Sequence, residues 1–252
     1  MDVQGTRHPP AEPGLRLQVT FVDLSEKMAA AWRQSFEQDP EVNVVCGSLL
    51  EQRADAWVTP TNSHLSMDGG VDAVVKRSLG DPIEAAAKRQ ARERFVSRRN
   101  ETLPIGCATC VATGRDVPRY LVSTPTMHES SEDVSATMNV ALACLAALQA
   151  VRMHNEANPA DQIYTVAIPG LGVGTGQVPP EIAADLMWSA YTLMKGQRFE
   201  DFRHASAALA AELGELNPMA APPAAPATAT SPAPAENVPA APPPDEDFDD
   251  FD

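Results

Sequence analysis

An amide and a carboxylate flank a pair of glycines in the stretch TNSHLSMDGGVDAVV, which contains Asn62, Gly69, Gly70 and Asp72. Asn62 can donate and accept hydrogen bonds at the hydroxyl groups of a sugar. Gly69 and Gly70 have no side chains, so their backbone N–H groups can approach a ligand closely. A helix is expected to begin at about Asp72, where the partial positive charge of the helix start favours an anion. The plainer alternatives are a turn for Asn62 and an ordinary helix start for Asp72.

A second glycine-rich stretch, IPGLGVGTGQVPPEIAA, carries glycines at positions 170, 172, 174 and 176 between an apolar strand and a helix. Such a loop can direct backbone N–H groups at a phosphate, and the helix start adds favourable partial charge. No Lys-Ser or Lys-Thr pair follows, and no later strand ends in an acid. Neither a Walker loop nor a dinucleotide fold of the Rossmann kind is therefore predicted. A tight turn is the alternative, but it requires fewer glycines. Two such strand-to-helix loops indicate a cleft that holds a diphosphate between them.

Two other motifs favour structural interpretations. VTFVDL places Asp23 at a strand end, as in methyltransferases, but only a polar leader precedes it, without the earlier strand and glycine-rich turn of such a site. We therefore interpret Asp23 as a strand-end or helix-start residue. CATC has CxxC spacing, but its surroundings are typical of a strand and no second cysteine pair completes a zinc site. Cys107 and Cys110 are predicted to be small buried residues, and no metal site is expected.

Strands and helices alternate along the chain. Most of the strands are apolar throughout, which is typical of a sheet that helices cover on both faces. The sequence thus predicts one α/β domain over residues 15–213. Predicted strands cover residues 15–24, 42–50, 54–60, 107–114, 120–126 and 162–170, and predicted helices cover residues 26–38, 72–79, 83–99, 135–154 and 179–196.

Composition limits the partners of the protein. The chain has 252 residues and a formal net charge of −15, which argues against a general affinity for nucleic acid phosphates or anionic lipid. Residues 1–14 are predicted to be a flexible leader, and residues 214–252 a disordered Pro- and Ala-rich tail with the acidic tip DEDFDDFD. The longest apolar run, residues 140–147, is too short for a membrane helix. The four cysteines show no framework spacing, so a cytoplasmic location is predicted.

The glycine-bearing stretches also resemble the signatures of a known family, the macrodomains, which bind ADP-ribose and related nucleotides. LPIGCATCVATG resembles a further segment of that family, and AIPGLGVGTGQVPPEIAA resembles its second loop and the following helix. The resemblance spans about residues 42–195 and is strongest to a bacterial and phage branch of the family. VTPTNSHLSMDGGVDAVVKRSLG is similar to the first signature without a gap, with matches at Asn62, Ser63, Leu65, Gly69, Gly70, Val71, Asp72, Arg77 and Gly80.

The resemblance implies a three-layer α/β/α fold around a mixed, mostly parallel sheet. It also implies that the two loops clamp the diphosphate of ADP-ribose and that Asn62 orients the distal ribose. Asp72 would activate or position the water that attacks the anomeric carbon. No cofactor is implied. The implied catalytic residues are Asn62 and Asp72, and the implied ligand-binding residues are Ser48, Asp68, Gly69, Gly70, Val71, Gly170, Gly172, Val173, Gly174, Thr175 and Gly176.

The chain departs from the family pattern at several positions, which include Met67 and Asp68 at two of four glycines, Thr175 and Gly176 in place of the aromatic of the second loop, and Lys76 in place of a His. Ser48 stands where the family usually has an Asp that holds the adenine amine, and Thr59 replaces the first Asn of the signature. The resemblance implies hydrolysis of an ADP-ribosyl linkage on protein or nucleic acid, or processing of an ADP-ribose derivative. The alternative is a module that binds the nucleotide without turnover. The tail tip resembles the acidic aromatic tips with which single-stranded-DNA-binding proteins recruit partners, and it also fits a solubilising tail. No membrane partner is expected.

Overall fold

The structure, a computed structural model, describes residues 17–95 and 102–216. Within these ranges the sheet has the strand order β2-β1-β6-β3-β5-β4. All neighbouring strands run parallel except β4 and β5. The carboxyl ends of the parallel strands therefore meet at one edge of the sheet, where ligands bind in such folds. The strands are β1 (Gln18–Asp23), β2 (Asn43–Cys46), β3 (Ala56–Asn62), β4 (Thr109–Ala112), β5 (Tyr120–Met127) and β6 (Thr165–Ile168).

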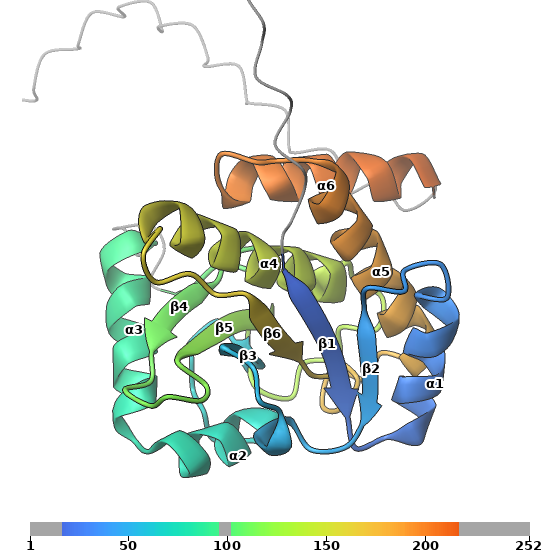
Figure 1. The fold of residues 1–252 in the computed structure, drawn as a ribbon. Coiled ribbons are helices and arrows are strands. Elements are labelled where there is room, and N and C mark those ends of the chain that lie inside the picture. The colour runs from blue at the N-terminus through green and yellow to red at the C-terminus, as the bar shows by residue number, and fades with distance from the viewer. Residues whose placement is uncertain (1–16, 96–101, 217–252) are drawn as a thin grey trace, which may run out of the picture.

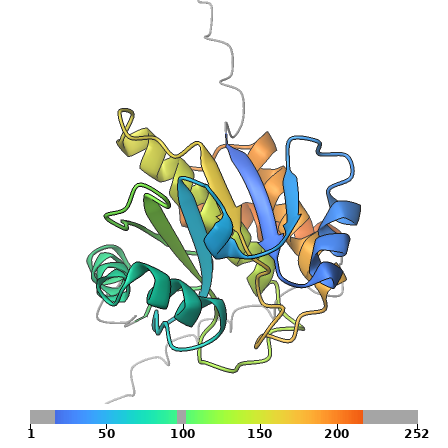
Figure 2. The ribbon, with the colours of Figure 1, turned by 60° about the horizontal axis from the view of Figure 1, so that its bottom comes forward.

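Helices cover both faces of this sheet and make three layers (Figures 1 and 2). On one face lie α1 (Glu26–Ser35), α4 (Asn139–Ala157) and α5 (Pro180–Gly196), with α6 (Phe202–Leu216) packed on α4 and α5. On the other face lie α2 (Gly70–Leu79) and α3 (Pro82–Arg94). A short 3-10 helix, η1 (Leu49–Glu51), follows β2. The fold is therefore the predicted α/β/α arrangement around a mixed, mostly parallel sheet.

The two hydrophobic cores assign the side chains of β3 to the two faces of the sheet. Ala56 and Val58 belong to the large apolar core under α1, α4 and α5, whereas Trp57 belongs to the smaller core under α2 and α3. Because successive side chains of a strand point to opposite faces, Thr59 and Thr61 continue the series of Trp57. Both threonines are buried. The register of β3 thus places two hydroxyl groups on the side of the sheet that α2 covers.

Each predicted strand and helix has a counterpart in the structure, with differences at the ends. The helix predicted over 135–154 begins only at Asn139, because Thr137 Oγ1 first accepts the N–H of Asn139. The helix predicted over 83–99 ends at Arg94, shortly before the described range stops. No element is predicted over residues 202–216, where the structure has α6.

The predicted leader lies outside the described residues, as does almost all of the predicted tail, so the domain boundaries stay predictions. In residues 17–95 and 102–216, no helix combines the length and the apolar character that crossing a membrane requires.

Candidate ligand-binding cleft

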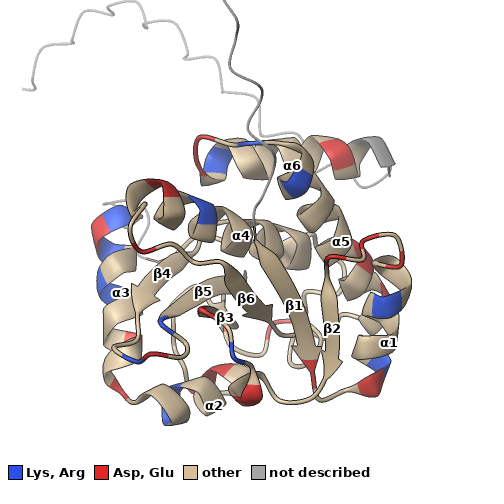
Figure 3. Ribbon diagram, in the orientation of Figure 1, with Lys and Arg blue, Asp and Glu red and all other residues tan. Residues whose placement is uncertain are grey.

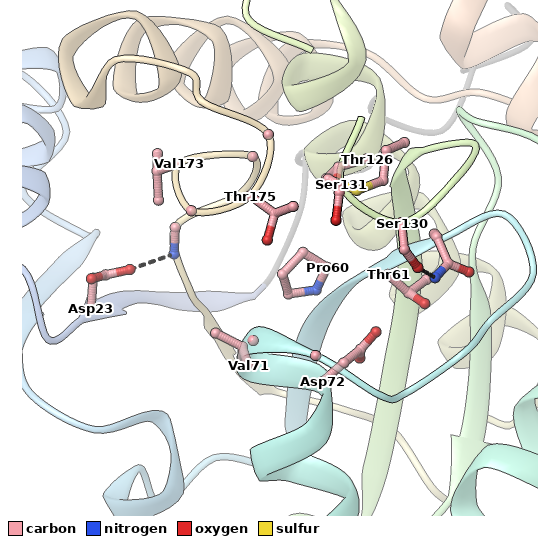
Figure 4. Close-up of a pocket in the computed structure, with 18 of the residues that line it drawn as sticks. Asp23, Pro60, Thr61, Val71, Asp72, Thr126, Ser130, Ser131, Val173 and Thr175 are labelled. Atoms are coloured by element: carbon pink, nitrogen blue, oxygen red, sulfur yellow. Dashed lines mark hydrogen bonds between the residues drawn. The ribbon is translucent and has the colours of Figure 1, made fainter. Parts of the chain in front are cut away.

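A cleft of about 650 Å³ opens at the carboxyl ends of the parallel strands (Figure 4). Ligand sites typically occupy roughly 300–1,000 Å³. β1, β3 and β6 each end at or shortly before a residue that lines the cleft, namely Asp23, Asn62 and Gly170. The structure thus brings both glycine-bearing loops to one place. The sequence-predicted site residues that line the cleft are Asn62, Asp68, Gly69, Gly70, Val71, Asp72, Gly170, Gly172, Val173, Gly174, Thr175 and Gly176.

The first loop presents free backbone N–H groups because of the way α2 begins. Gly69 precedes the helix and has no side chain that could accept a hydrogen bond from the first turn. Gly70 has a φ of +53°, a conformation that other residues rarely adopt. Among the described residues, no acceptor pairs with the N–H groups of residues 69–72. These donors and the positive end of α2 are available to an anion.

The second loop has the same property. Hydrogen bonds of 3.1 Å close it, from Gln177 N–H to the Gly174 carbonyl and from Val178 N–H to the Gly172 carbonyl. The loop then leads through Pro180 into α5, whose start also lines the cleft. Over the ranges that the structure describes, the N–H groups of residues 173–176 have no acceptor. Both loops therefore turn unpaired donors toward the same cleft.

The side-chain amide of Asn62 holds the first loop in place. Its Oδ1 accepts hydrogen bonds from the backbone N–H groups of His64 (3.0 Å) and Ser66 (3.2 Å), which fixes the orientation of the amide. Its Nδ2 donates to Ser130 Oγ at 3.0 Å. Asn62 is 6% exposed and lines the cleft. A sugar hydroxyl in the cleft would compete with Ser130 for the Nδ2 donor.

Asp72 combines burial with a strongly perturbed pKa. It lies in the first turn of α2, is 4% exposed, and accepts a hydrogen bond of 2.5 Å from Thr59 Oγ1. Burial raises the pKa of the Asp72 carboxyl to about 7. The hydroxyl groups of Thr59 and Thr61 act in the opposite direction, and the negative charges of Asp68 and Glu84 add to the increase. A carboxyl with a pKa near neutrality can exchange a proton with a reacting group at neutral pH.

Asp23 lies on the other side of the cleft from Asp72, as Figure 4 shows. Its Oδ1 accepts from Ser25 N–H at 2.8 Å and its Oδ2 accepts from Gly170 N–H at 3.2 Å. A Cβ atom on Gly170 would lie 2.7 Å from Asp23 Oδ2, 2.7 Å from Val173 Cγ2 and 3.4 Å from Met28 Cγ. One carboxylate and two apolar side chains therefore converge here. The sequence analysis did not place Asp23 in the cleft, although an acid at the carboxyl end of an inner strand could have indicated that it lies there.

Ser48 does not line the cleft. Its Oγ accepts the N–H of Leu50 at 3.2 Å, and its carbonyl oxygen accepts from Gln52 Nε2 at 3.0 Å, so it caps η1. The reason is topological, because Ser48 follows the edge strand β2, whereas β1 lies between β2 and β6. Asp23 at the end of β1 reaches the cleft, and Ser48 does not.

The lining of the cleft contains carboxylates but neither Lys nor Arg. Acidic positions mark the end of β1 and the start of α2 in Figure 3, whereas α3 carries many of the basic ones. Backbone N–H groups and hydroxyl groups are therefore the donors that this cleft offers to an anion. The polar side chains of the lining that sequence reasoning missed, besides Asp23, are Ser25, Thr61, Ser66, Thr126, Ser130 and Ser131.

The two cysteines of the CATC motif are partly buried, rather than buried as predicted. Cys107 and Cys110 are free, and Cys110 lies on β4. Burial raises the pKa of the Cys107 thiol to about 11 and that of Cys110 to about 12, so neither is a reactive thiolate at neutral pH. Within the described ranges, no cluster of three His, Cys, Asp or Glu residues could hold a metal ion.

Comparison with known proteins identifies a family with this arrangement. The family model for the Macro domain matches residues 58–187, just over half of the 252 residues. The macro domain-containing protein in the sno 5' region of Streptomyces nogalater is 31% identical over 180 residues, which cover 69% of this chain and 92% of that protein. An uncharacterised protein of Aquifex aeolicus is 35% identical over 147 residues, which cover 58% of this chain and 78% of that protein.

Solved structures give a weaker likeness. The macrodomain of Mycobacterium tuberculosis DarG is 25% identical with a TM-score of 0.46, and the alignment covers 58% of this chain and 86% of that chain. The Oceanobacillus iheyensis macrodomain with ADP is 15% identical with a TM-score of 0.47, covering 67% of this chain and 90% of that chain. The family model decides the assignment: this chain belongs to the Macro domain family, a family that binds ADP-ribose.

Proposed function

We propose that the protein binds ADP-ribose, or a closely related NAD-derived nucleotide, in this cleft and hydrolyses an ADP-ribosyl linkage. The observation that carries the proposal is that residues 69–72 and 173–176 line one cleft, and that their backbone N–H groups have no acceptor among the described residues. Because the lining has no Lys or Arg, these N–H groups, the hydroxyl groups of the lining and the starts of α2 and α5 would hold an anion. A diphosphate can use both sets of donors at once.

The side chains on either side of the glycine loops indicate which end of the ligand lies at which end of the cleft. The Asp23 carboxylate only accepts hydrogen bonds and lies beside Met28 and Val173, which suits a flat ring with an exocyclic amine, such as adenine. Asn62 Nδ2 suits a hydroxyl of the distal ribose. In this orientation Asp72 lies near the anomeric carbon.

Asp72 acts as the general base in the proposed reaction. The oxygen of a water molecule bonds to the anomeric carbon, the bond from that carbon to the acceptor atom breaks, and its electron pair leaves with the acceptor. Asp72 takes the proton from the attacking water and returns it to the departing acceptor or to solvent. A pKa of about 7 permits both transfers at neutral pH. The acceptor belongs to a modified protein or nucleic acid.

A module that binds the nucleotide without turnover is the second candidate. The observation that favours it is that the amide of Asn62 is fully engaged by His64, Ser66 and Ser130. One assay distinguishes the two candidate functions. It measures the release of ADP-ribose from modified protein and from modified oligonucleotide by wild type and by Asp72→Ala. Exposed Glu37, outside the cleft, provides the matched control Glu37→Ala.

If the protein is a hydrolase, the wild type and Glu37→Ala both release ADP-ribose. Asp72→Ala then binds ADP-ribose but no longer releases it from the modified substrates. Calorimetric binding of ADP-ribose by a wild type that releases none would instead establish the binding module. Binding that stays undetectable at millimolar ADP-ribose would overturn both candidates.

We also propose a cytoplasmic location and a recruiting role for the acidic tip. The four cysteines are free, as expected in a reducing compartment. The tip, residues 245–252, lies outside the described residues, so its proposed role rests on its sequence alone. A pull-down with the full chain and with residues 245–252 deleted tests it, and an unchanged set of captured proteins would contradict recruitment.

A further inference from the structure

The Ser130 hydroxyl lies at the side of the cleft opposite to Asp23, as Figure 4 shows. Its Oγ accepts a hydrogen bond of 3.0 Å from Asn62 Nδ2. A serine hydroxyl also has one hydrogen of its own to donate, and no described group accepts it. Because Ser130 is exposed and lines the cleft, this hydrogen is available to a ligand. Ser130 therefore offers a donor at the end of the cleft where the distal ribose is proposed to lie.

The side-chain amide of Asn62 already has partners for its polar atoms. Its Oδ1 accepts from the backbone N–H groups of His64 and Ser66. Its Nδ2 carries two hydrogens. This nitrogen lies 3.0 Å from Ser130 Oγ and 3.5 Å from the Ser66 carbonyl oxygen. A sugar hydroxyl could therefore bond to Asn62 only by displacing one of these partners.

The segment that leads to Ser130 is fastened to the first glycine-bearing loop. Ser63 N–H donates to the His128 carbonyl oxygen at 3.2 Å, and Ser63 Oγ lies 3.3 Å from Nδ1 of the same histidine. His64 Nε2 lies 2.9 Å from Glu129 Oε1. Three successive residues of the loop, 62–64, thus contact three successive residues of the segment, 128–130.

The turn around Ser130 is also closed from its far side. Glu132 Oε2 accepts from the His128 N–H at 2.7 Å, which closes the turn over residues 128–132. Ser131 has a φ of +71°, a conformation that residues other than glycine rarely adopt. Such a backbone persists only where its surroundings hold it. Displacement of Ser130 would disturb these contacts, whereas a ligand hydroxyl that bonds to Ser130 would leave them intact.

We propose that Ser130 is the residue that binds a hydroxyl of the distal ribose, and that Asn62 is a positioning residue that acts through Ser130. In this arrangement Ser130 Oγ accepts from Asn62 Nδ2 and donates its own hydrogen to the sugar oxygen. The inference rests on the proposed binding of ADP-ribose and applies to the hydrolase and to the binding module alike. It gives Asn62 an indirect part in orienting the distal ribose.

The first experiment compares two nucleotides by calorimetry, ADP-ribose and ADP, of which ADP lacks the distal ribose. We expect Ser130→Ala to weaken ADP-ribose binding by about 3- to 10-fold, the effect of one neutral hydrogen bond, and to leave ADP affinity within about twofold of wild type. If the sugar instead displaced Ser130, the same substitution would free the Asn62 donor and strengthen ADP-ribose binding. The direction of the change therefore decides between the two arrangements.

Two further variants accompany Ser130→Ala. Ser130→Thr keeps a hydroxyl and should recover most of the ADP-ribose affinity. Ser135→Ala is the matched control, because Ser135 belongs to the same connection between β5 and α4 but does not line the cleft. It should bind both nucleotides as wild type does. ADP-ribose binding by Ser130→Ala that is unchanged or tighter would overturn the inference.

The second experiment tests the positioning role of Asn62. Asn62→Asp keeps an oxygen for the N–H groups of His64 and Ser66 but replaces Nδ2 by an acceptor, so the Ser130 hydroxyl donates to it and is withdrawn from the ligand. The added charge weakens both nucleotides, so the readout is the ratio of ADP-ribose to ADP affinity. We expect this ratio to fall as far as in Ser130→Ala, and the double variant to show no further loss. A wild-type ratio in Asn62→Asp would overturn the positioning role.

The nucleotide affinities of the wild type separate failure of this inference from failure of the proposed function. If the wild type and Ser130→Ala bind both nucleotides equally well, nucleotide binding in the cleft stands and only the Ser130 contact is overturned. If the wild type binds neither ADP nor ADP-ribose at millimolar concentration, the proposed function is overturned and this inference with it.

Discussion

The backbone N–H of Gly170 donates to the carboxylate of Asp23 at 3.2 Å, although the two residues lie 147 positions apart in the chain. The bond joins the end of β1 to the loop that follows the neighbouring strand β6. It therefore fixes the start of the second glycine loop and also presents an acceptor-only side chain at one side of the cleft.

Replacement of Asp23 tests whether this carboxylate recognises the base. We expect Asp23→Ala to weaken ADP-ribose binding by about 10- to 100-fold, because a hydrogen bond to a charged group contributes roughly 1.5–3 kcal/mol. Calorimetry at neutral pH measures the change. Wild type should prefer ADP-ribose to the inosine analogue, in which a keto oxygen replaces the adenine amine. Asp23→Ala should lose this preference, and equal affinity of wild type for the two nucleotides would contradict base recognition by Asp23.

Substitution of two glycines in the second loop should distinguish an effect on folding from an effect on ligand binding. A Cβ atom on Gly176 would lie 2.7 Å from the Gly172 carbonyl oxygen and 2.8 Å from Val134 Cγ2, whereas one on Gly174 would have no atom within 4 Å. We expect Gly176→Ala to destabilise the fold by about 1–3 kcal/mol, since the loop must move to admit the methyl group. Gly174→Ala should unfold at the wild-type temperature but bind ADP-ribose about tenfold more weakly, because its methyl group enters the space that the ligand needs. Calorimetric unfolding and binding measure both effects, and full affinity in Gly174→Ala would show that the ligand does not approach this residue.

The sequence predicted those parts of the site that are local in the chain. Each glycine loop is a strand, a turn and a helix start in immediate succession, so its pattern is complete within a few residues. The contribution of Asp23 depends on the pairing of β1 with β6, which no local pattern reveals. Ser48 was predicted to bind the ligand from its position in the family pattern, but it follows the edge strand β2 and does not line the cleft. The family pattern alone does not tell which strand reaches the cleft.

Thr61 was missed for a related reason. On a buried strand a threonine resembles any other β-branched residue, and only the structure shows that Thr61 lies beside Asp72 at the cleft.

The buried carboxyl of Asp72 should make stability depend on pH. Its folded pKa of about 7 lies above the ordinary value of 3.8, so the folded state binds the proton more tightly than the unfolded state does. Stability is therefore lost as the pH rises from about 4 to about 7. Asp72→Asn carries no charge and still accepts from Thr59, so we expect it to be more stable than wild type at pH 8 by about 1–4 kcal/mol. The two proteins should differ much less at pH 4.5.

Denaturant unfolding at both pH values measures this difference. Exposed Asp81→Asn is the control and should show no comparable change between pH 4.5 and pH 8. A difference between wild type and Asp72→Asn that is equal at the two pH values would exclude a raised pKa of Asp72 as its cause.

Asp55 should stabilise the fold without contributing to the cleft. It precedes β3 at the end opposite to Asn62, and its Oδ2 accepts from Tyr164 N–H at 2.9 Å and Thr165 N–H at 3.0 Å, while Arg119 Nη2 donates to Oδ1 at 3.1 Å. Burial alone would raise the pKa of Asp55, but these hydrogen bonds together lower it, so its contribution is present above about pH 4 and is lost as the pH falls further. We expect Asp55→Ala to lower the free energy of unfolding at neutral pH by about 1.5–3 kcal/mol, because it leaves several donors unpaired. ADP-ribose affinity should be unchanged. Unfolding and calorimetric titration test the two parts separately, and a weakened affinity in a folded Asp55→Ala protein would show that the two ends of the sheet are coupled.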